Sequence, residues 1–313
     1  MVRKWNPGMG FSGALSWPRR VTSAGALSLS LALAAAPAGA FCRTTTCDRA
    51  TECEYDALGC PSVGVPLAWK SGCVSYSVNR SASPKRGIDY ETTHAITARA
   101  FARWTAADCR GNAPSIDISD LSPASCGEPE YNSDAPNANV IMFRDGNWPE
   151  EYDPAAVAHT VITFHTDTGE IFDADIEVNS FGTDLTTSDA NVGFDLESII
   201  VHEAGHFLGL DHSHLGDATM FFRQAHGDIS LRDLVSDDAN GICSMYPPDR
   251  NASTTACSPR HGFSPNCGSP EDEGCAVAGT PGGSKRAWPL AVMLALGTAL
   301  GVVRRRRSSN PRA

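Results

Sequence analysis

The central part of this sequence has few basic residues. Of 25 lysines and arginines in 313 residues, four lie in residues 1–40 and seven in residues 276–313, whereas all 36 aspartates and glutamates lie in residues 41–275. That segment keeps 14 basic residues against 36 acidic ones and has a formal charge of −22. Nucleic-acid binding needs clustered positive charge, so we expect no nucleic-acid partner. Such acidity is compatible with oxygen-ligated calcium sites.

Long apolar runs are also scarce. The first run, Ala24–Ala36, is too short to span a bilayer. Four basic residues precede it and the small residues Ala38-Gly-Ala40 follow, as in a secretory signal peptide with its cleavage site. We therefore predict that residues 1–40 are a signal peptide cleaved near Ala40, and that the protein is secreted.

The second apolar run, Ala287–Val303, has seventeen residues without a charge and would form roughly 25 Å of helix, which barely spans the hydrocarbon core. Four arginines, Arg304–Arg307, follow it and would stay on the cytoplasmic side. We predict a transmembrane sorting segment at 287–307, preceded by a stalk rich in Cys, Pro, Ser and Gly at 248–286. The secreted protein would then be membrane-anchored or sorted to the cell surface.

None of the cysteines has the spacing of a structural zinc site. In a secreted chain, the eleven cysteines instead predict a disulfide framework. Cys275 lies beside the sorting segment and is the natural unpaired residue, so the other ten could form five bridges, whose connectivity stays open. Four of these ten lie in residues 41–66, which we predict to be a small cross-linked N-terminal segment.

The segment Val201–Ser213 reads VHEAGHFLGLDHS and contains the candidate metal-binding and catalytic residues. On a helix, His202 and His206 lie on one face, one turn apart, and can bind a single metal ion. Glu203 follows the first ligand and can reach a metal-bound water without being a ligand itself, which is the helix signature of zinc metalloproteases.

A third ligand follows after a turn. Glycine tolerates positive φ, so Gly209 can end the helix and return His212 to the same metal. Three imidazoles and an open position are typical of a catalytic zinc site, not of a structural one. We predict one Zn²⁺, with Glu203 taking a proton from the zinc-bound water and passing it to the leaving amine during peptide-bond hydrolysis.

The string HEAGHFLGLDHS resembles the active-site string of the metzincins and, within them, of the matrixins, the matrix-metalloproteinase family. Met220 stands where that family has its Met-turn, and residues 236–242 resemble the beginning of its last helix. The resemblance covers 67–247. It implies an α+β metzincin-type catalytic domain, with a twisted, mostly parallel sheet and a zinc site between upper and lower subdomains. It also implies protein or peptide substrates, held in extended form at an edge strand.

The ends of the elements can be read from periodicity and caps. We expect strands at 73–78, 115–118, 138–143, 158–165 and 171–179, and helices at 88–108, after the cap Asp195, and at 236–246 with Ser236 as cap. The strand 171–179 alternates polar and apolar residues, which is typical of a half-buried strand.

The strand 171–179 also contains candidate ligands for metal ions other than the catalytic zinc. The matrixin resemblance implies structural zinc and calcium ligands in this region, but Phe172 stands where a partner of His159 is expected, so we predict no second zinc. The carboxylates on the polar side are candidate calcium ligands: Asp173, Asp175 and Glu177.

Other parts of the chain depart from the family pattern. The cysteine-switch string is absent, and we expect Cys60 to form a disulfide; the Pro-x-Tyr wall after the Met-turn is absent as well. Latency and cleavage specificity are therefore open, and no feature indicates an oligomeric state. Two alternatives remain: a non-catalytic surface binding or adhesion module on the same fold, against which Glu203 argues, and another metzincin branch such as the pappalysins.

The C-terminal region carries a second resemblance. Cys275, the apolar run and the arginine cluster together resemble the myxobacterial C-terminal sorting tag, MYXO-CTERM. This implies retention in a membrane, with or without later processing to the cell surface, and a plain tail anchor is the alternative.

Overall fold

The computed structural model describes residues 2–5, 40–49, 52–252 and 257–268. The predicted signal-peptide run Ala24–Ala36, Cys275 and the predicted sorting segment 287–307 lie outside these residues. Within the described part of the chain, no helix has both the length and the apolar character needed to span a membrane.

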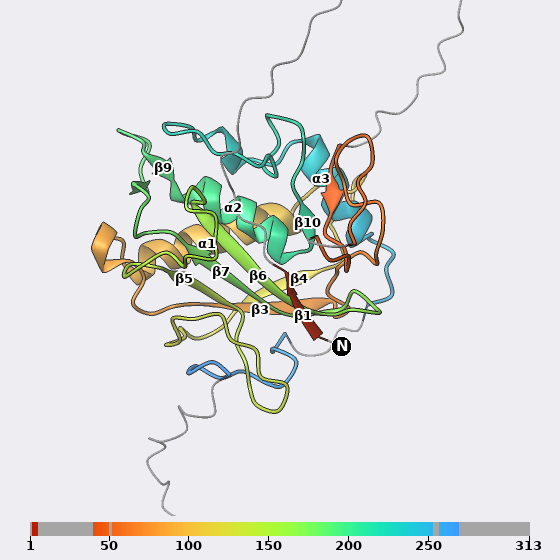
Figure 1. Ribbon diagram of the computed structural model, residues 1–313, viewed down its shortest axis with the longest axis horizontal. Coiled ribbons are helices and arrows are strands. Elements are labelled where there is room, and N and C mark those ends of the chain that lie inside the picture. Colours follow the sequence, from red (N-terminus) through yellow and green to blue (C-terminus); the bar gives the residue numbers. More distant parts are fainter. Residues whose placement is uncertain (1, 6–39, 50–51, 253–256, 269–313) are drawn as a thin grey trace, which may run out of the picture. The chain divides into compact units, whose positions relative to one another are not determined.

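A six-stranded sheet forms the centre of the fold, with the strand order β1-β6-β7-β5-β3-β4 (Figure 1). Its strands are β1 (Val2–Trp5), β3 (Cys73–Val78), β4 (Asp117–Asp120), β5 (Val140–Phe143), β6 (Ala158–His165) and β7 (Ile171–Val178). The pairs β3–β4, β3–β5 and β5–β7 are parallel, whereas β6 pairs antiparallel with both β7 and β1. The prediction of a mostly parallel sheet is confirmed, but β1 was not expected.

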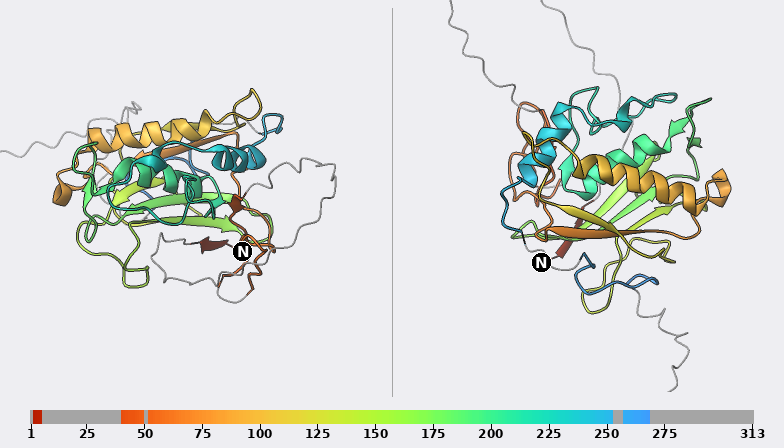
Figure 2. Two further views of the ribbon diagram at one scale, coloured as in Figure 1. Left: turned by 90° about the horizontal axis from the view of Figure 1, so that it is seen from above. Right: turned by 180° about the vertical axis from the view of Figure 1, so that it is seen from behind.

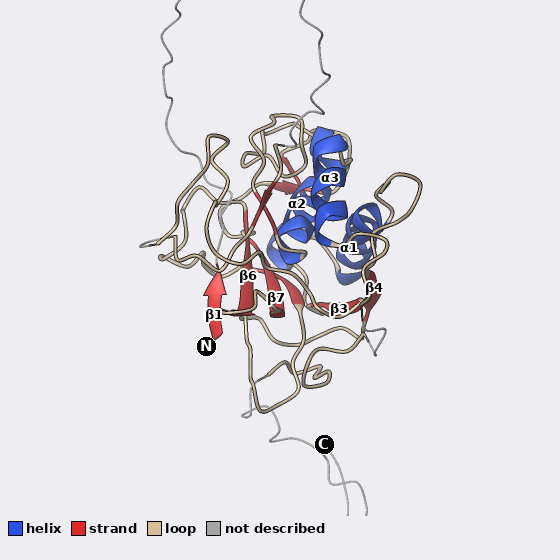
Figure 3. Ribbon diagram, turned by 90° about the vertical axis from the view of Figure 1, so that its right-hand side faces the viewer, coloured by secondary structure: helices blue, strands red, loops and turns tan. Residues whose placement is uncertain are grey.

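The longer helices α1 (Tyr90–Thr105), α2 (Leu196–Phe207) and α3 (Ser236–Met245) gather on one side of the sheet (Figures 2 and 3). We call the sheet face that they cover the inner face. In α1, Ile96, Phe101 and Trp104 are buried at helical spacing, and the Asp89 side chain caps the helix by accepting from Thr92 N at 2.8 Å. The Trp104 indole donates to Val201 O at 2.8 Å, which joins α1 to α2.

Helix α2 contains residues with a preference for strands. Ile199, Ile200 and Val201 are β-branched, yet each has no exposed surface and belongs to the main hydrophobic core. Burial outweighs the weak local preference here. Asp195 is the N-cap as predicted, because its carboxylate accepts from Ser198 N at 2.8 Å, and Arg232 binds the same carboxylate.

The opposite, outer face of the sheet is also covered. The loop between β4 and β5 and residues 257–268 pack there around a second apolar cluster that includes Ala124, Val140 and Met142 (Figure 1). As a result all eight residues of β7 are buried. The expectation of a half-buried strand was wrong, because loops rather than solvent lie over its polar side.

Five disulfides cross-link the described residues: Cys42–Cys60, Cys47–Cys53, Cys73–Cys257, Cys109–Cys243 and Cys126–Cys267. The disulfide role of Cys60 is therefore confirmed, and the first two bridges lie within the predicted N-terminal segment. Two others hold residues 257–268, which we had assigned to the stalk, against the sheet. Residues 248–252 of that assignment also pack on the domain, because Arg250 donates to Trp69 O at 2.8 Å. A stalk at 269–286 stays a prediction.

Shorter elements complete the fold. The 3-10 helices are η1 (Pro84–Arg86) and η2 (Ser230–Arg232), and two small sheets pair β2 (Cys42–Arg43) with β10 (Leu210–Asp211) and β8 (Leu185–Thr186) with β9 (Phe194–Asp195).

In α3 the N-cap is Val235, not Ser236 as expected. The difference arises because Asp238, one turn into the helix, accepts from Val235 N at 2.9 Å and so fixes the start one residue earlier.

Candidate metal centre

Three histidine side chains converge above the inner face of the sheet. His202 and His206 come from consecutive turns of α2, and His212 follows β10. The Nε2 atoms of His202 and His206 are 3.0 Å apart, and those of His206 and His212 are 3.3 Å apart. In the described residues this is the one group of histidine, cysteine or acidic side chains arranged to hold a metal ion, with its ligand atoms within 4.8 Å of one another.

Backbone carbonyls orient two of these rings. Thr219 O lies 2.7 Å from His202 Nδ1, and Leu210 O lies 2.8 Å from His206 Nδ1, so each Nδ1 carries the proton and each Nε2 keeps its lone pair. Burial lowers the pKa of all three imidazoles well below the usual histidine value. Neutral imidazoles with convergent Nε2 atoms are the ligands that zinc takes, so the residues present fit the metal.

Gly209 makes the return of His212 feasible. Its φ is +96°, a left-handed conformation that residues with a side chain rarely adopt. A Cβ atom at this position would also lie 2.5 Å from Leu67 O, closer than atoms can approach. Any side chain here would therefore displace the segment that carries the third histidine.

Glu203 is fully buried beside the histidines. Its Oε2 accepts a hydrogen bond from the Thr160 hydroxyl of β6, whereas Oε1 has no hydrogen-bond partner among the described residues. Burial raises the pKa of the Glu203 carboxyl to about 8, although the Thr160 hydroxyl opposes the shift. Thr160 was missed at the sequence level; its signal was a polar residue at an inward-facing position of a buried strand.

Met220 lies beneath α2 as the Met-turn resemblance implies. A Cβ on Gly205 would meet Met220 Sδ at 2.2 Å and Trp104 Cζ2 at 2.8 Å, so the helix and the turn touch at a glycine. Asp238 accepts from Thr219 N at 2.9 Å and Met220 N at 3.0 Å, and so fixes the turn whose carbonyl orients His202. The sequence did not identify Asp238 as part of the site.

The three candidate calcium ligands lie on the outer face and are engaged with other groups. Both Glu177 oxygens are bound, one by Arg144 and the other by the Tyr152 hydroxyl. Asp175 accepts from Val140 N at 2.8 Å and shares a hydrogen bond with Asp173. Calcium at these residues stays a prediction.

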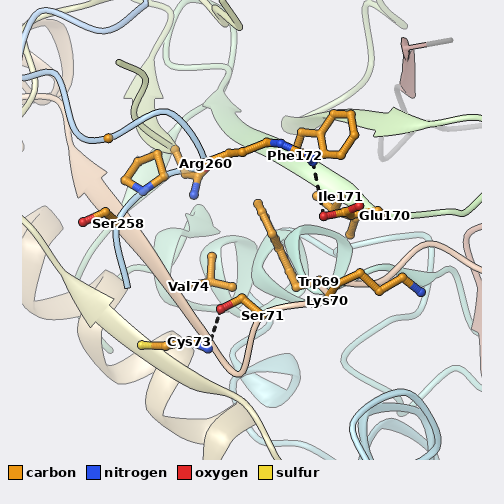
Figure 4. Close-up of a pocket in the computed structure, with 13 residues that line it drawn as sticks. Trp69, Lys70, Ser71, Cys73, Val74, Glu170, Ile171, Phe172, Ser258 and Arg260 are labelled. Atoms are coloured by element: carbon orange, nitrogen blue, oxygen red, sulfur yellow. Dashed lines mark hydrogen bonds and ion pairs between the residues drawn. The ribbon is translucent and has the colours of Figure 1, made fainter. Parts of the chain in front are cut away.

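A separate cavity of about 390 Å³ lies beside the first residues of β7, and none of the three histidines lines it (Figure 4). Trp69 and Phe172 line it, and Arg260 from the C-terminal residues lies 4.0 Å over the Phe172 ring while pairing with Glu170 at 3.2 Å. This cavity is therefore separate from the three histidines.

Comparison with known proteins agrees with this geometry. Residues 140–247 match the family model of the matrixins. The matched region carries α2, the three histidines and α3 on a mixed sheet, so the fold agrees with the α+β metzincin type. The family that this region resembles is one of metallopeptidases.

Individual relatives are similar over stretches of 57 to 186 residues. The chain is 31% identical to metalloendoproteinase 1 of Glycine max over 182 residues, which cover 57% of this chain and 52% of that protein. It is 47% identical to metalloendoproteinase 5-MMP of Arabidopsis thaliana over 57 residues, 18% of this chain and 16% of that protein. Matrix metalloproteinase-25 of Mus musculus is 25% identical over 186 residues, 57% of this chain and 27% of that protein. The chain thus spans about half of these relatives' length or less.

Proposed function

We propose that the protein is a secreted or surface-anchored zinc-dependent endopeptidase that hydrolyses peptide bonds with Glu203 as general base. One observation carries the proposal. Three neutral imidazoles present their Nε2 atoms within 4.8 Å of one another beside a buried carboxylate that has one oxygen without a partner. A metal site that served structure alone would not need that carboxylate.

The roles of the residues follow from their surroundings. His202, His206 and His212 would hold the zinc ion, which when bound lowers the pKa of a water molecule to about 7 and polarises a carbonyl group. Thr160 holds Oε2 of Glu203 in place and leaves Oε1 to accept the water proton. Glu203 then delivers that proton to the leaving amine.

The substrate would be an extended peptide lying along β6. This strand is next to the edge of the sheet, and only its second half, Ile162–His165, is paired with β1, which belongs to the residues that the proposed cleavage near Ala40 removes. Along Ala158–Val161 the side away from β7 has no partner strand in the described part of the chain, and Thr160, the neighbour of Glu203, lies in this stretch. Strand addition at such an edge supports the substrate by main-chain hydrogen bonds.

The test compares Glu203→Gln with wild type and with the matched control Glu91→Gln, which removes an exposed carboxylate from α1. The new N-termini of peptides from a mixed proteome are profiled, with and without a zinc chelator, and zinc content is measured in each protein. Wild type and Glu91→Gln should cleave peptides unless chelated, whereas Glu203→Gln should bind zinc but cleave at least about 100-fold more slowly. Chelator-insensitive cleavage, or unchanged cleavage by Glu203→Gln, contradicts the proposal.

Secretion and anchoring rest on the two apolar ends of the sequence. Export with cleavage near Ala40 and loss of membrane association on deleting residues 287–313 are the expected results. Cell fractionation with N-terminal sequencing of the mature protein measures both. A mature protein that retains residues 1–40, or a truncated protein that stays in the membrane fraction, contradicts this part.

A further inference from the structure

The cross-linked N-terminal segment is attached to the loop that delivers the third histidine. We call residues 41–66, closed by Cys42–Cys60 and Cys47–Cys53, the stapled module. Its strand β2 pairs antiparallel with β10, so that Cys42 lies opposite Asp211, and Thr44 N donates to Gly209 O at 3.0 Å. The module therefore follows the metal-binding loop from the end of α2 to the residue before His212.

One contact leads from the module to His206. The hydroxyl of Thr44, which has no exposed surface, donates to Leu210 O at 3.1 Å. The same carbonyl oxygen lies 2.8 Å from His206 Nδ1. A single backbone carbonyl thus joins a module side chain to a metal-binding ring, and the Thr44 hydroxyl fixes the oxygen that orients the imidazole.

A second contact leads to His212. The Arg49 guanidinium forms an ion pair with Oδ2 of the buried Asp211, whose Oδ1 accepts from His212 N at 2.8 Å. Arg49 therefore fixes the rotamer of the carboxylate that in turn fixes the backbone at the third ligand. The hydrogen bonds between an arginine and a buried carboxylate are directional. The position of Arg49 therefore affects the orientation of the Asp211 carboxylate.

The Cys47–Cys53 bridge controls where Arg49 lies. It closes a loop with a sequence separation of six residues around Asp48 and Arg49. Asp48 O accepts from both Glu52 N at 2.8 Å and Cys53 N at 3.1 Å, which tightens the loop further. Without the bridge, Arg49 would have to order a longer flexible segment to reach Asp211.

We propose that Thr44 and Arg49 are positioning residues for the metal ligands, and that the Cys47–Cys53 disulfide sustains metal affinity through Arg49. The inference rests on the proposed zinc site and adds that this site is completed by a part of the chain outside the catalytic motif. Contacts that orient metal ligands typically change affinity by about 10–100-fold. Each module substitution is therefore expected to weaken zinc binding without removing a ligand.

The test measures the zinc dissociation constant of the full chain by competition with a chromophoric chelator. Thr44→Val and Arg49→Met should each raise it about 10-fold or more, and the double variant Cys47→Ser/Cys53→Ser should resemble Arg49→Met. The matched controls are Thr46→Val, which loses a hydrogen bond within the module, and Arg43→Met, which loses an exposed charge from β2; both should stay within about twofold.

Two further measurements separate positioning from a general loss of stability. The visible absorption of the cobalt-substituted protein should change in Thr44→Val and Arg49→Met but not in the controls, because it reports ligand geometry. The zinc-free proteins should unfold at temperatures close to those of their controls. Arg49→Lys, which keeps the charge, should restore part of the affinity.

The outcomes are distinguishable. Zinc dissociation constants of Thr44→Val and Arg49→Met that match wild type, or match those of Thr46→Val and Arg43→Met, overturn this inference while leaving the proposed function intact. A wild-type protein that binds no zinc contradicts the proposed function, and this inference with it. If the cysteine variant does not fold, the Arg49→Met result alone decides.

Discussion

The two faces of the β6–β7 pair both bury polar side chains, but they bury them differently. On the inner face, Thr160 reaches Glu203 beside the three histidines. On the outer face, His159 and the carboxylates of β7 lie under loops. Both sets are withdrawn from water, so burial alone does not distinguish a reactive site from a structural one.

The difference lies in where the unpaired atoms point. Inside, carbonyls bind the Nδ1 atoms of His202 and His206, and the Nε2 atoms meet at one place. Outside, Glu177 is satisfied by Arg144 and Tyr152, and His159 stacks on Tyr152 with ring centroids 4.1 Å apart. Burial lowers the pKa of His159 to about 3, but its nitrogens face no other ligand set in the described residues. The metal site is therefore distinguished by the convergence of the imidazole lone pairs, and not by the mere presence of buried polar groups.

The largest expected effect tests this contrast directly. His206→Gln should lower zinc affinity by more than about 100-fold, because it removes a ligand and not merely a supporting contact. His159→Gln should leave zinc binding unchanged, with one zinc per molecule as in wild type. Elemental analysis of dialysed protein measures the stoichiometry. A wild-type content of two zinc ions that falls to one in His159→Gln would contradict the separation of the two faces.

A smaller effect is expected from packing on the inner face. Gly205→Ala places a Cβ against Met220 and Trp104 and should lower the free energy of unfolding by about 1–3 kcal/mol. The control Gly127→Ala, in a loop on the outer side with nothing within 4 Å of the added Cβ, should be nearly neutral. Urea unfolding of both variants measures the difference, and equal stabilities would show that α2 and the Met-turn are not rigidly packed.

The smallest effect concerns the outer carboxylates and depends on pH. Burial and then the neighbouring Asp175 raise the pKa of Asp173 above its usual value. Between the unfolded pKa near 3.9 and the raised folded pKa, the folded state binds more protons, so the unfolding free energy falls as pH rises. Asp173→Asn mimics the protonated carboxyl and should add about 1 kcal/mol of stability near pH 8 but little near pH 4.

The effect of calcium on stability decides how the Asp173→Asn result is interpreted. Unfolding is measured with a chelator present and again with millimolar calcium. Calcium that stabilises wild type, together with an Asp173→Asn variant that is less stable near pH 8, would support the calcium prediction and refute the explanation from the raised pKa of Asp173. Stabilisation by Asp173→Asn and no response to calcium would count against calcium at Asp173, Asp175 and Glu177.

Local patterns predicted much of the fold. The strand 158–165 was predicted with its observed bounds, and the Asp195 cap, the helix after it and the position of Gly209 all follow from near neighbours. The contacts that complete the site could not be predicted this way. Thr160 meets Glu203 and Thr44 meets Leu210 across 43 and 166 residues. No local period encodes such pairs, since they depend on strand order and on the path of the stapled module.

The polar side of β7 is a second case in which a local pattern could not predict a long-range contact. Alternation correctly separated Asp173, Asp175 and Glu177 from the core side chains, but it could not show what covers them. That cover comes from residues around Gly127 and from residues 257–268, brought there by Cys126–Cys267. A pattern of period two identifies the two faces of a strand and leaves open which of them meets water.

The two bridges that hold residues 257–268 also determine how the domain would respond to a mechanical load. Tension on the chain beyond Gly268 reaches Cys267 first and passes through the covalent bond to Cys126; what remains passes from Cys257 to Cys73 at the start of β3. The Cys73–Cys257 bridge lies in parallel with the backbone between Tyr246 and Cys257, so α3 and the Met-turn do not carry the load alone. A domain attached to a surface through its C-terminal end could thus be pulled while its three histidines keep their relative positions.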